Sequence, residues 1–358
     1  MSDFQIAGRT IGPGHPTYII AEMSGNHGQS FQQAEDIVRA AKESGADAIK
    51  LQTYTADTLT IPSDKPSFVV GKGSLWSGRT LHDLYSEAYT PWEWQPKLKA
   101  LANELGMDCF STPFDDSAVK FLEKMDVPVY KIASFELVDD GLLKSVARMG
   151  KPVIMSTGMA TLDEIEHAVD TLRAAGCKQL ALLKCTSAYP APPDEMHLRT
   201  IPDLAQRFDV PVGLSDHTLG IAVPVAAVAL GACIIEKHFT LSRSHPGPDT
   251  AFSLEPQEFR AMVDAVRTSE KAFGGVHYGA DQQEAKSRVF RRSLFVVKDI
   301  KAGALFTPEN VRSIRPGYGL APRYLDDVLG ERATADIERG TPLEWKHVSG
   351  GQPSGGSR

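Results

Sequence analysis

Lysine, hydroxyl and carboxylate side chains follow a series of short apolar runs along the sequence. Lys50, Lys131 and Lys184 each lie in or directly after such a run. A lysine is rarely buried without a partner, and the residues around Lys50 and Lys131 have the pattern of buried strands. We therefore expect these two lysines to bind an anion, and the hydroxyl and backbone N–H groups beside them suit a phosphate or a carboxylate. The alternative is a set of surface lysines whose stems cover apolar neighbours.

Two histidines, His217 and His238, end neighbouring runs of the same kind. Neutral imidazoles in that position suit a divalent transition metal, with aspartate or water as further ligands. Two hydrogen-bonded histidines that bind no metal explain the pattern equally well, and no clustered Cys/His spacing indicates a structural zinc site. Glu22 and Glu136 are candidates for general bases or hydroxyl-binding groups, and either could pair with a lysine.

Strands and helices alternate through the part of the chain that carries these residues. From Thr17 to Phe273 the apolar runs are typical of eight strands separated by amphipathic helices. Eight strand–helix units predict an α/β fold with a (β/α)₈ TIM barrel, whose chemistry lies at the C-terminal ends of its strands. A doubly wound open sheet is the alternative, but it usually has fewer units and a glycine-rich first turn. The predicted strands are Tyr18–Ala21, Ala48–Leu51, Asp108–Ser111, Val129–Ile132, Val153–Met155, Leu180–Leu183, Val212–Leu214 and Cys233–Glu236.

Composition and turn residues suggest where the domains end. With 358 residues, of which 42% are hydrophobic and 23% charged, the chain is globular and can hold a large barrel and a small second domain. We expect a barrel over residues 1–274, a linker over 275–292, a compact β-type domain over 293–349 and a flexible tail over 350–358. One connection in the barrel, Thr53 to Pro91, is unusually long and includes the aromatic Trp76. Thr161 and Glu164 form a capping-box pattern that predicts a helix from Leu162.

Charge, hydropathy and cysteine spacing narrow the classes of partner. A net charge of −7 argues against a sequence-independent nucleic-acid binder, which needs a basic face. The uncharged run Thr218–Ile235 contains glycine, proline and much alanine, so we expect a buried helix, Ile221–Leu230, and a buried strand instead of a membrane span. The absence of a C-x-x-C pair favours buried free thiols in a reducing cytoplasm for the four cysteines, Cys109, Cys177, Cys185 and Cys233.

At the ends of the predicted strands the sequence resembles the sialic acid synthase family. The matching runs cover almost the whole chain and are Ile20–Gly28, Asp47–Thr53, Phe110–Asp115, Tyr130–Ser134, Ser156–Met159, Gly213–Thr218, Glu236–Thr240, Gly247–Asp249 and Arg315–Gly317. The resemblance implies a barrel followed by a small antifreeze-like (β-clip) domain, and a homodimer with domain-swapped C-terminal domains. It also implies a transferase that condenses phosphoenolpyruvate with an N-acyl amino sugar to give a nonulosonic acid and phosphate.

Within this family the sequence is most similar to the pseudaminic acid synthases. The resemblance rests on the long connection, Gly73–Trp94, and on Lys184–Pro190, where N-acetylneuraminate synthases typically carry His and Asn in place of Lys184 and Ser187. The implied sugar is 2,4-diacetamido-2,4,6-trideoxy-L-altrose, and a less polar 6-deoxy sugar suits an aromatic lid. N-acetylneuraminate and legionaminate synthesis remain alternatives. So do a metal-free aldolase with Lys131 or Lys184 as Schiff-base lysine, and a non-catalytic carbohydrate-binding protein.

The resemblance also implies a role for each residue of the candidate site. Phosphoenolpyruvate would be held by Lys50, Thr112, Lys131, Ser134, Ser156, Lys184 and Ser187. His217 and His238 would bind Mn²⁺, with Mg²⁺ or Co²⁺ as alternatives, and the ion would polarise the sugar aldehyde. The catalytic set would comprise this histidine, His238, together with Glu22, Glu136 and Asp249, of which the carboxylates would orient the sugar or activate water. Gln52, Tyr189 and Arg315 would contact the sugar, Arg315 from the partner subunit.

Overall fold

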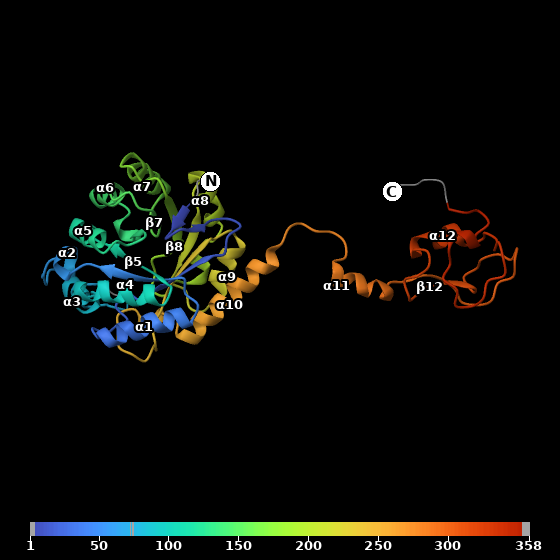
Figure 1. Cartoon of the computed structure of the whole chain (residues 1–358), viewed down its shortest axis with the longest axis horizontal. Coiled ribbons are helices and arrows are strands. Elements are labelled where there is room, and N and C mark those ends of the chain that lie inside the picture. The colour runs from blue at the N-terminus through green and yellow to red at the C-terminus, as the bar shows by residue number, and fades with distance from the viewer. Residues whose placement is uncertain (1–3, 72, 74, 353–358) are drawn as a thin grey trace. The chain divides into compact units, whose positions relative to one another are not determined.

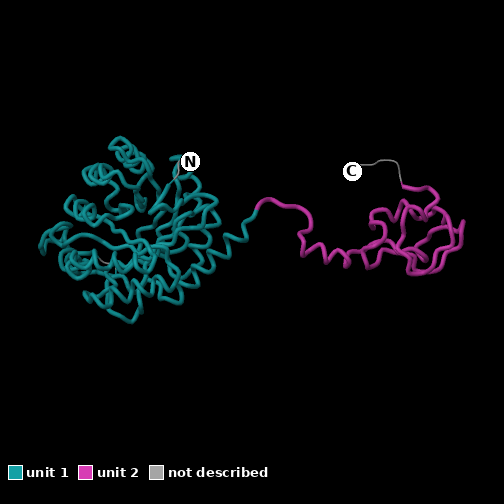
Figure 2. Tube along the Cα trace, viewed as in Figure 1, with its two compact units in different colours: residues 1–274 teal, residues 275–358 magenta. Residues whose placement is uncertain are grey.

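The computed structural model describes residues 4–71, 73 and 75–352, and these form two compact units. The first unit covers Met1–Gly274 and the second covers Gly275–Arg358 (Figure 2). Each unit has its own cluster of buried hydrophobic residues. The last six residues of the predicted tail, 353–358, lie outside the described residues.

A closed barrel of eight parallel strands forms the centre of the first unit, in the order β10-β3-β4-β5-β6-β7-β8-β9. The predicted (β/α)₈ barrel is therefore confirmed. Most strands end one or two residues later than predicted, because polar residues at the rim still pair with the neighbouring strand. The strands are β3 (Tyr18–Glu22), β4 (Ala48–Thr53), β5 (Asp108–Pro113), β6 (Tyr130–Ile132), β7 (Val153–Ser156), β8 (Leu180–Cys185), β9 (Val212–Asp216) and β10 (Ile234–His238).

Helices surround the barrel and cover the outer faces of its strands (Figure 1). They are α1 (Phe31–Glu43), α4 (Gln95–Glu104), α5 (Asp116–Lys124), α6 (Asp140–Arg148), α7 (Leu162–Ala174), α8 (Thr200–Phe208), α9 (Ala222–Ala229) and α10 (Pro256–Phe273). The capping box of α7 is present, since Thr161 N–H donates to Glu164 Oε2 at 2.7 Å and Glu164 N–H donates to Thr161 Oγ1 at 3.3 Å. No helix in the described part of the chain is long and apolar enough to cross a membrane.

Two segments of the first unit lie outside the strand–helix repeat. An antiparallel hairpin of β1 (Phe4–Ile6) and β2 (Arg9–Ile11) precedes the barrel and was not predicted. Arg9 of this hairpin forms a 2.5 Å ion pair with Asp47, which precedes β4, so the hairpin contacts the N-terminal end of the barrel. The long connection after β4 contains α2 (Ala56–Leu59), a 3₁₀ turn (Pro66–Phe68) and α3 (Leu81–Ala88).

The second unit combines short helices with a two-stranded antiparallel sheet. The sheet joins β11 (Ser293–Val296) to β12 (Val311–Ile314), and isolated bridges such as Ile300–Ile337 extend the pairing. The unit also contains α11 (Gln282–Ala285), a 3₁₀ turn (Lys286–Phe290) and α12 (Leu325–Val328). Its core includes Leu294, Phe306, Val311, Val328 and Leu343.

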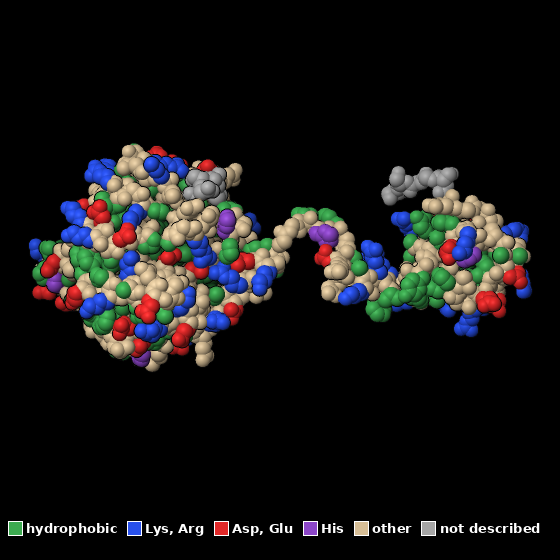
Figure 3. All heavy atoms as spheres, in the orientation of Figure 1, with side chains coloured by type: hydrophobic (Ala, Val, Ile, Leu, Met, Phe, Trp, Pro, Cys, Tyr) green, Lys and Arg blue, Asp and Glu red, His purple; other side chains and the backbone are tan. Residues whose placement is uncertain are grey.

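Surface and buried polar groups are distributed differently in the first unit. On the face shown in Figure 3, lysine and arginine side chains are interspersed with aspartate and glutamate. The four cysteines are buried and form no disulfide, as predicted. Several charged side chains are nevertheless fully buried at the C-terminal ends of the barrel strands. These groups form the candidate site.

Candidate active site

Four buried charges form a connected chain at the C-terminal mouth of the barrel. Lys50 Nζ on β4 lies 2.6 Å from Glu22 Oε2 on β3 and 3.6 Å from Glu236 Oε1 on β10. Lys131 Nζ on β6 also lies 3.6 Å from Glu236 Oε1. The inward-facing positions of different strands therefore bring two lysines and two glutamates together. Glu22 pairs with a lysine, which is one of the three roles that its sequence position allows.

Hydroxyl groups surround the two lysines, as their positions after the strands suggest. Lys131 Nζ donates to Ser156 Oγ at 2.7 Å, and Lys50 Nζ donates to Thr112 Oγ1 at 3.3 Å. Two further serines meet around Gly158, where a Cβ atom would lie 2.8 Å from Ser134 Oγ and 2.3 Å from Ser187 Oγ. Only glycine fits between these serine side chains, and its N–H donates to Ser134 Oγ at 3.0 Å.

Lys184 is not brought into this cluster. Its strand neighbour Cys185 faces the barrel mouth, where Cys185 Sγ lies 3.9 Å from His217 Nδ1 and 3.8 Å from Ser187 Oγ. Successive residues of a strand point to opposite faces, so the side chain of Lys184 leaves from the outer side of the wall. Its Nζ donates to the carbonyl oxygen of Cys185 at 2.6 Å and to Thr186 Oγ1 at 3.3 Å. The predicted strand ended at Leu183, before Lys184. Because β8 in fact continues to Cys185, Lys184 is a strand residue and its side chain follows the alternation of the strand.

The two histidines lie side by side at the ends of β9 and β10. Their ring centroids are 5.3 Å apart. His217 Nδ1 donates to the carbonyl oxygen of Thr186 at 3.0 Å, while the buried His238 Nδ1 has no hydrogen-bond partner and lies 3.9 Å from Asp249 Oδ2. Burial and the neighbouring His217 lower the pKa of His238 well below its usual value, so its imidazole is neutral near pH 7. In the described ranges no group of three or more His, Cys, Asp and Glu side chains could hold a metal ion.

Burial controls the protonation of the carboxylates at the mouth. It raises the pKa of Glu22 to about 7, against the lowering effect of Lys50 and with a further rise from Glu236. Burial also raises the pKa of Glu136 to about 7, and Glu136 Oε2 has no hydrogen-bond partner. Glu236 behaves in the opposite way, since Lys131 and Lys50 outweigh the effect of burial and lower its pKa. The mouth therefore holds carboxylates that titrate near neutral pH beside one that stays ionised.

A hydrogen-bonded chain links Glu22 to Asp249. Gln52 Nε2 donates to Glu22 Oε1 at 2.9 Å and to Ser24 Oγ at 3.1 Å. Ser24 Oγ in turn donates to Asp249 Oδ2. The chain joins three of the residues predicted for the catalytic and sugar sites, and Ser24 is the unpredicted link.

Aromatic rings form one wall beside the histidines. The centroid of the Tyr189 ring lies 4.4 Å from that of His217 and 5.3 Å from that of Phe252. The Phe252 and His238 ring centroids are 4.9 Å apart. Trp76 of the long connection packs on Tyr189 at 5.7 Å, and its Nε1–H donates to the carbonyl oxygen of Pro248 at 2.8 Å. The long connection therefore places Trp76 against the aromatic wall of the site. Arg315, which the resemblance assigns to the sugar site, directly follows β12 and belongs to the second unit.

Comparison with known protein families gives a match for each of the two units. The NeuB family matches residues 37–278, and the SAF domain matches residues 291–349. This chain belongs to the NeuB family. Its motif-based resemblance to the sialic acid synthases is thereby confirmed, and so is the antifreeze-like C-terminal domain. Several of its relatives are synthases, and the chain is an enzyme of this family.

Relatives of this NeuB-family chain match along almost its whole length. It is 47% identical to a pseudaminic acid synthase of Campylobacter jejuni, over 91% of this chain and 95% of that one. It is 42% identical to a pseudaminic acid synthase of Helicobacter pylori, over 92% and 96%. It is 38% identical to an N,N'-diacetyllegionaminic acid synthase of Legionella pneumophila, over 92% and 94%. Among solved structures, an N-acetylneuraminic acid synthetase of Leptospira borgpetersenii superposes with a TM-score of 0.71 at 30% identity, covering 80% of this chain and 95% of that one.

Glu236 is the main site residue of this NeuB-family enzyme that the sequence argument missed. It contacts both buried lysines, and Ser215 Oγ donates to its Oε1 at 3.3 Å. A signal was available, because Glu236 and His238 are two residues apart on one strand and must face the same side. It was overlooked because β10 was predicted to end at Glu236.

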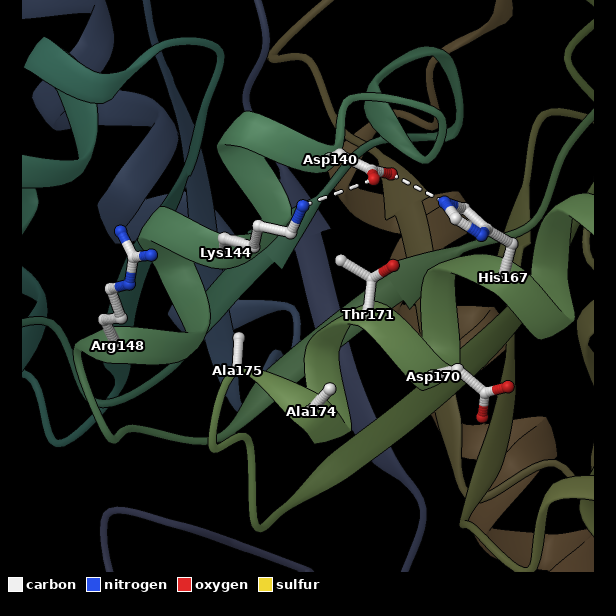
Figure 4. A pocket seen from close by; sticks show the side chains of 8 residues that line it. All are labelled: Asp140, Lys144, Arg148, His167, Asp170, Thr171, Ala174 and Ala175. Carbon is white, nitrogen blue, oxygen red and sulfur yellow. Dashed lines mark hydrogen bonds and ion pairs between the residues drawn. The ribbon is translucent and has the colours of Figure 1, made fainter.

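A separate surface pocket of about 690 Å³ lies between α6 and α7 (Figure 4). Asp140 contacts His167 at 2.8 Å and Lys144 at 3.4 Å there. These exposed groups satisfy one another, and surface ion pairs of this kind need no ligand. We place the chemistry at the barrel mouth, because the buried atoms Glu136 Oε2, Glu236 Oε2 and His238 Nδ1, which have no hydrogen-bond partner, lie there.

Proposed function

We propose that this chain condenses phosphoenolpyruvate with 2,4-diacetamido-2,4,6-trideoxy-L-altrose to give pseudaminic acid and phosphate. The observation that carries the proposal is the juxtaposition of two buried, hydroxyl-flanked lysines with a histidine pair and unpartnered carboxylates. The two relatives at 42% and 47% identity that bear the name pseudaminic acid synthase support this choice of sugar. Legionaminate and N-acetylneuraminate synthesis are the alternatives.

Lys50 and Lys131 are the proposed anion cradle for phosphoenolpyruvate. Thr112 and Ser156 already accept hydrogen bonds from these lysines and can donate their own hydroxyl protons to phosphate or carboxylate oxygens. The hydroxyl groups of Ser134, which accepts the Gly158 N–H, and of Ser187 extend the cradle on one side. Lys184 is left out of this set because its side chain leaves from the other face of β8.

His217 and His238 are the proposed ligands of a divalent cation, and Mn²⁺ is our first choice. The residues fit such an ion, because the bond from His217 Nδ1 to a backbone carbonyl orients the ring and leaves Nε2 free for a metal. Two imidazoles beside Asp249 also leave positions for water and substrate, which is typical of catalytic and not of structural sites. When bound, the ion supplies Lewis-acid polarisation of the sugar aldehyde oxygen.

Glu136 and the Glu22–Gln52–Asp249 chain are the proposed proton-transfer and orienting groups. The methylene carbon of phosphoenolpyruvate forms the new bond to the aldehyde carbon, and water then adds to the resulting oxocarbenium carbon. A carboxylate with a pKa of about 7, such as Glu136, can accept the proton that this water loses. Cleavage of the carbon–oxygen bond then releases phosphate. Gln52 holds Glu22 and Ser24 in place for the sugar hydroxyl groups.

Isotope and substrate assays test this reaction. In ¹⁸O-labelled water the label should enter the sugar acid, and label in the released phosphate would contradict carbon–oxygen cleavage. Phosphate release should require both substrates and should be fastest with the diacetamido-trideoxy-L-altrose when that sugar, N-acetylmannosamine and the legionaminate precursor are compared in parallel. A stable adduct after borohydride treatment with pyruvate would favour the aldolase alternative, and no phosphate release with any sugar would favour a binding protein.

We also propose that the enzyme is a cytoplasmic homodimer in which residues 275–292 act as a linker and Arg315 reaches the sugar site of the partner. Support comes from the division of the chain into two units, with Arg315 in the second. Subunit complementation tests this arrangement. Lys131→Met and Arg315→Ala chains, each impaired alone, should regain activity when co-expressed, because one mixed site is intact. Two impaired chains that stay inactive together would contradict the swapped arrangement.

A further inference from the structure

A fully buried ion pair lies next to both histidines in sequence but on the opposite side of the barrel wall. Asp216 and Lys237 are register partners on the parallel strands β9 and β10. Lys237 Nζ lies 2.5 Å from Asp216 Oδ2, and both side chains are 0% exposed. Glu236 and His238 face the barrel mouth, so strand alternation turns Lys237 to the outer side. The pair therefore belongs to the wall behind the site.

The hydrogen bonds of this pair hold the backbone on both sides of His217. Asp216 Oδ1 accepts from the Thr218 N–H at 3.0 Å, and Asp216 Oδ2 accepts from Thr218 Oγ1 at 3.2 Å. Lys237 Nζ donates to the carbonyl oxygen of Thr218 as well as to Asp216. Hydrogen bonds therefore join the two residues that flank His217, namely Asp216 and Thr218. Both of these residues also bond to Lys237, which directly precedes His238.

Stability alone is a weak reason for such a pair. Two charges lose their hydration on burial, and replacement of a buried ion pair by neutral groups of similar size is often neutral or stabilising. What the pair does supply is direction, because its bonds fix the separation of β9 and β10 where the histidines leave the wall. Groups that orient metal-binding histidines typically change metal affinity about 10–100-fold when they are removed.

We propose that Asp216 and Lys237 are positioning residues that hold His217 and His238 in the arrangement needed to bind a divalent cation. The inference rests on the proposed function only for the role of the histidine pair. It adds two residues outside the barrel mouth whose side chains contact neither substrate nor cation.

Calorimetric titration of the full-length, metal-free protein with Mn²⁺ alone tests the assignment. Asp216→Asn and Lys237→Met should each weaken Mn²⁺ binding about 10–100-fold. Phosphoenolpyruvate affinity, measured in the same way without metal, should stay unchanged, because the Lys50–Lys131 cradle is separate. Arg9→Met is the matched control, since it removes the ion pair with Asp47 at the other end of the barrel and should leave Mn²⁺ affinity unaltered.

Each outcome decides between positioning and support of the fold. The double variant Asp216→Asn/Lys237→Met has no buried charge at this point, so it should fold and still bind Mn²⁺ weakly if a single variant unfolds. Unchanged Mn²⁺ affinity in folded variants would overturn the inference, and so would equal losses of Mn²⁺ and phosphoenolpyruvate affinity. A double variant that also fails to fold would assign the pair to stability. Wild-type protein that binds no Mn²⁺ would overturn the proposed metal site together with this inference.

Discussion

Replacement of Lys131 by methionine tests the anion cradle most directly, and Lys184 offers a matched control. Both lysines come from barrel strands or their rims, and the sequence alone makes both candidates for binding the same anion. Lys131 faces the mouth and donates to Ser156, whereas Lys184 donates to the backbone beside it. Methionine keeps the length of the apolar stem and removes only the charge. Lys131→Met therefore removes a charge from the inner face of the barrel wall, and Lys184→Met removes one from the outer face.

The expected loss for Lys131→Met follows from the geometry of the buried cluster. Two unit charges about 4 Å apart interact by about 4 kcal/mol at an effective dielectric constant of about 20. Glu236, at 3.6 Å, already offsets part of the Lys131 charge. We therefore expect Lys131→Met to lose about 3 kcal/mol of transition-state stabilisation, which is at the upper end of the contribution of hydrogen bonds to charged groups. This loss corresponds to about 100-fold in kcat/KM for phosphoenolpyruvate, at about 1.4 kcal/mol for each factor of ten.

Lys184→Met should change kcat/KM for phosphoenolpyruvate by less than about fivefold, because partly exposed charges of this kind contribute about 0.2–1 kcal/mol. Phosphate release at saturating sugar, with phosphoenolpyruvate varied, measures both constants. Thermal unfolding followed by circular dichroism checks the fold of Lys131→Met, in which Lys50 still pairs with Glu236 at 3.6 Å. Equal losses in the two variants, or a larger loss in Lys184→Met, would refute the alternation argument that separates them.

Three further predictions concern protons, metal and sugar. Burial raises the pKa of Glu136 to about 7, so its carboxylate forms as pH rises through that value; kcat/KM should rise with it, and Glu136→Gln should abolish the rise. A rise that persists in the variant would assign this ionisation to Glu22. Chelation should abolish turnover and Mn²⁺ should restore it in the wild type but not in His217→Ala, whereas activity indifferent to chelation would contradict the metal site. Trp76→Ala should lower kcat/KM by about twofold to twelvefold more for the 6-deoxy sugar than for N-acetylmannosamine, from about 0.5–1.5 kcal/mol of aromatic contact; equal losses would argue against the lid.

Most of the candidate site could be predicted from the sequence, because parallel strands bring their C-terminal ends to one rim. Lys50, Lys131 and Glu22 come together for this reason, although they are up to 109 positions apart in the chain. The approach of His217 and His238 follows from the adjacency of β9 and β10. The sequence argument did not anticipate that Glu236 lies within 3.6 Å of both lysines and offsets part of their charge.

The sequence by itself determined the barrel, the order of its strands, the second domain and the family, since apolar periodicity, caps and motifs are local properties of the chain. Only the tertiary structure decided which way particular side chains face and what they meet. A shift of two residues in the end of β8 separates Lys184 from the site, and a similar shift in β10 admits Glu236. The hydrogen bond from Trp76 Nε1–H to the carbonyl oxygen of Pro248 joins residues that are 172 positions apart. Such contacts depend on packing between distant segments, and no local pattern records that packing.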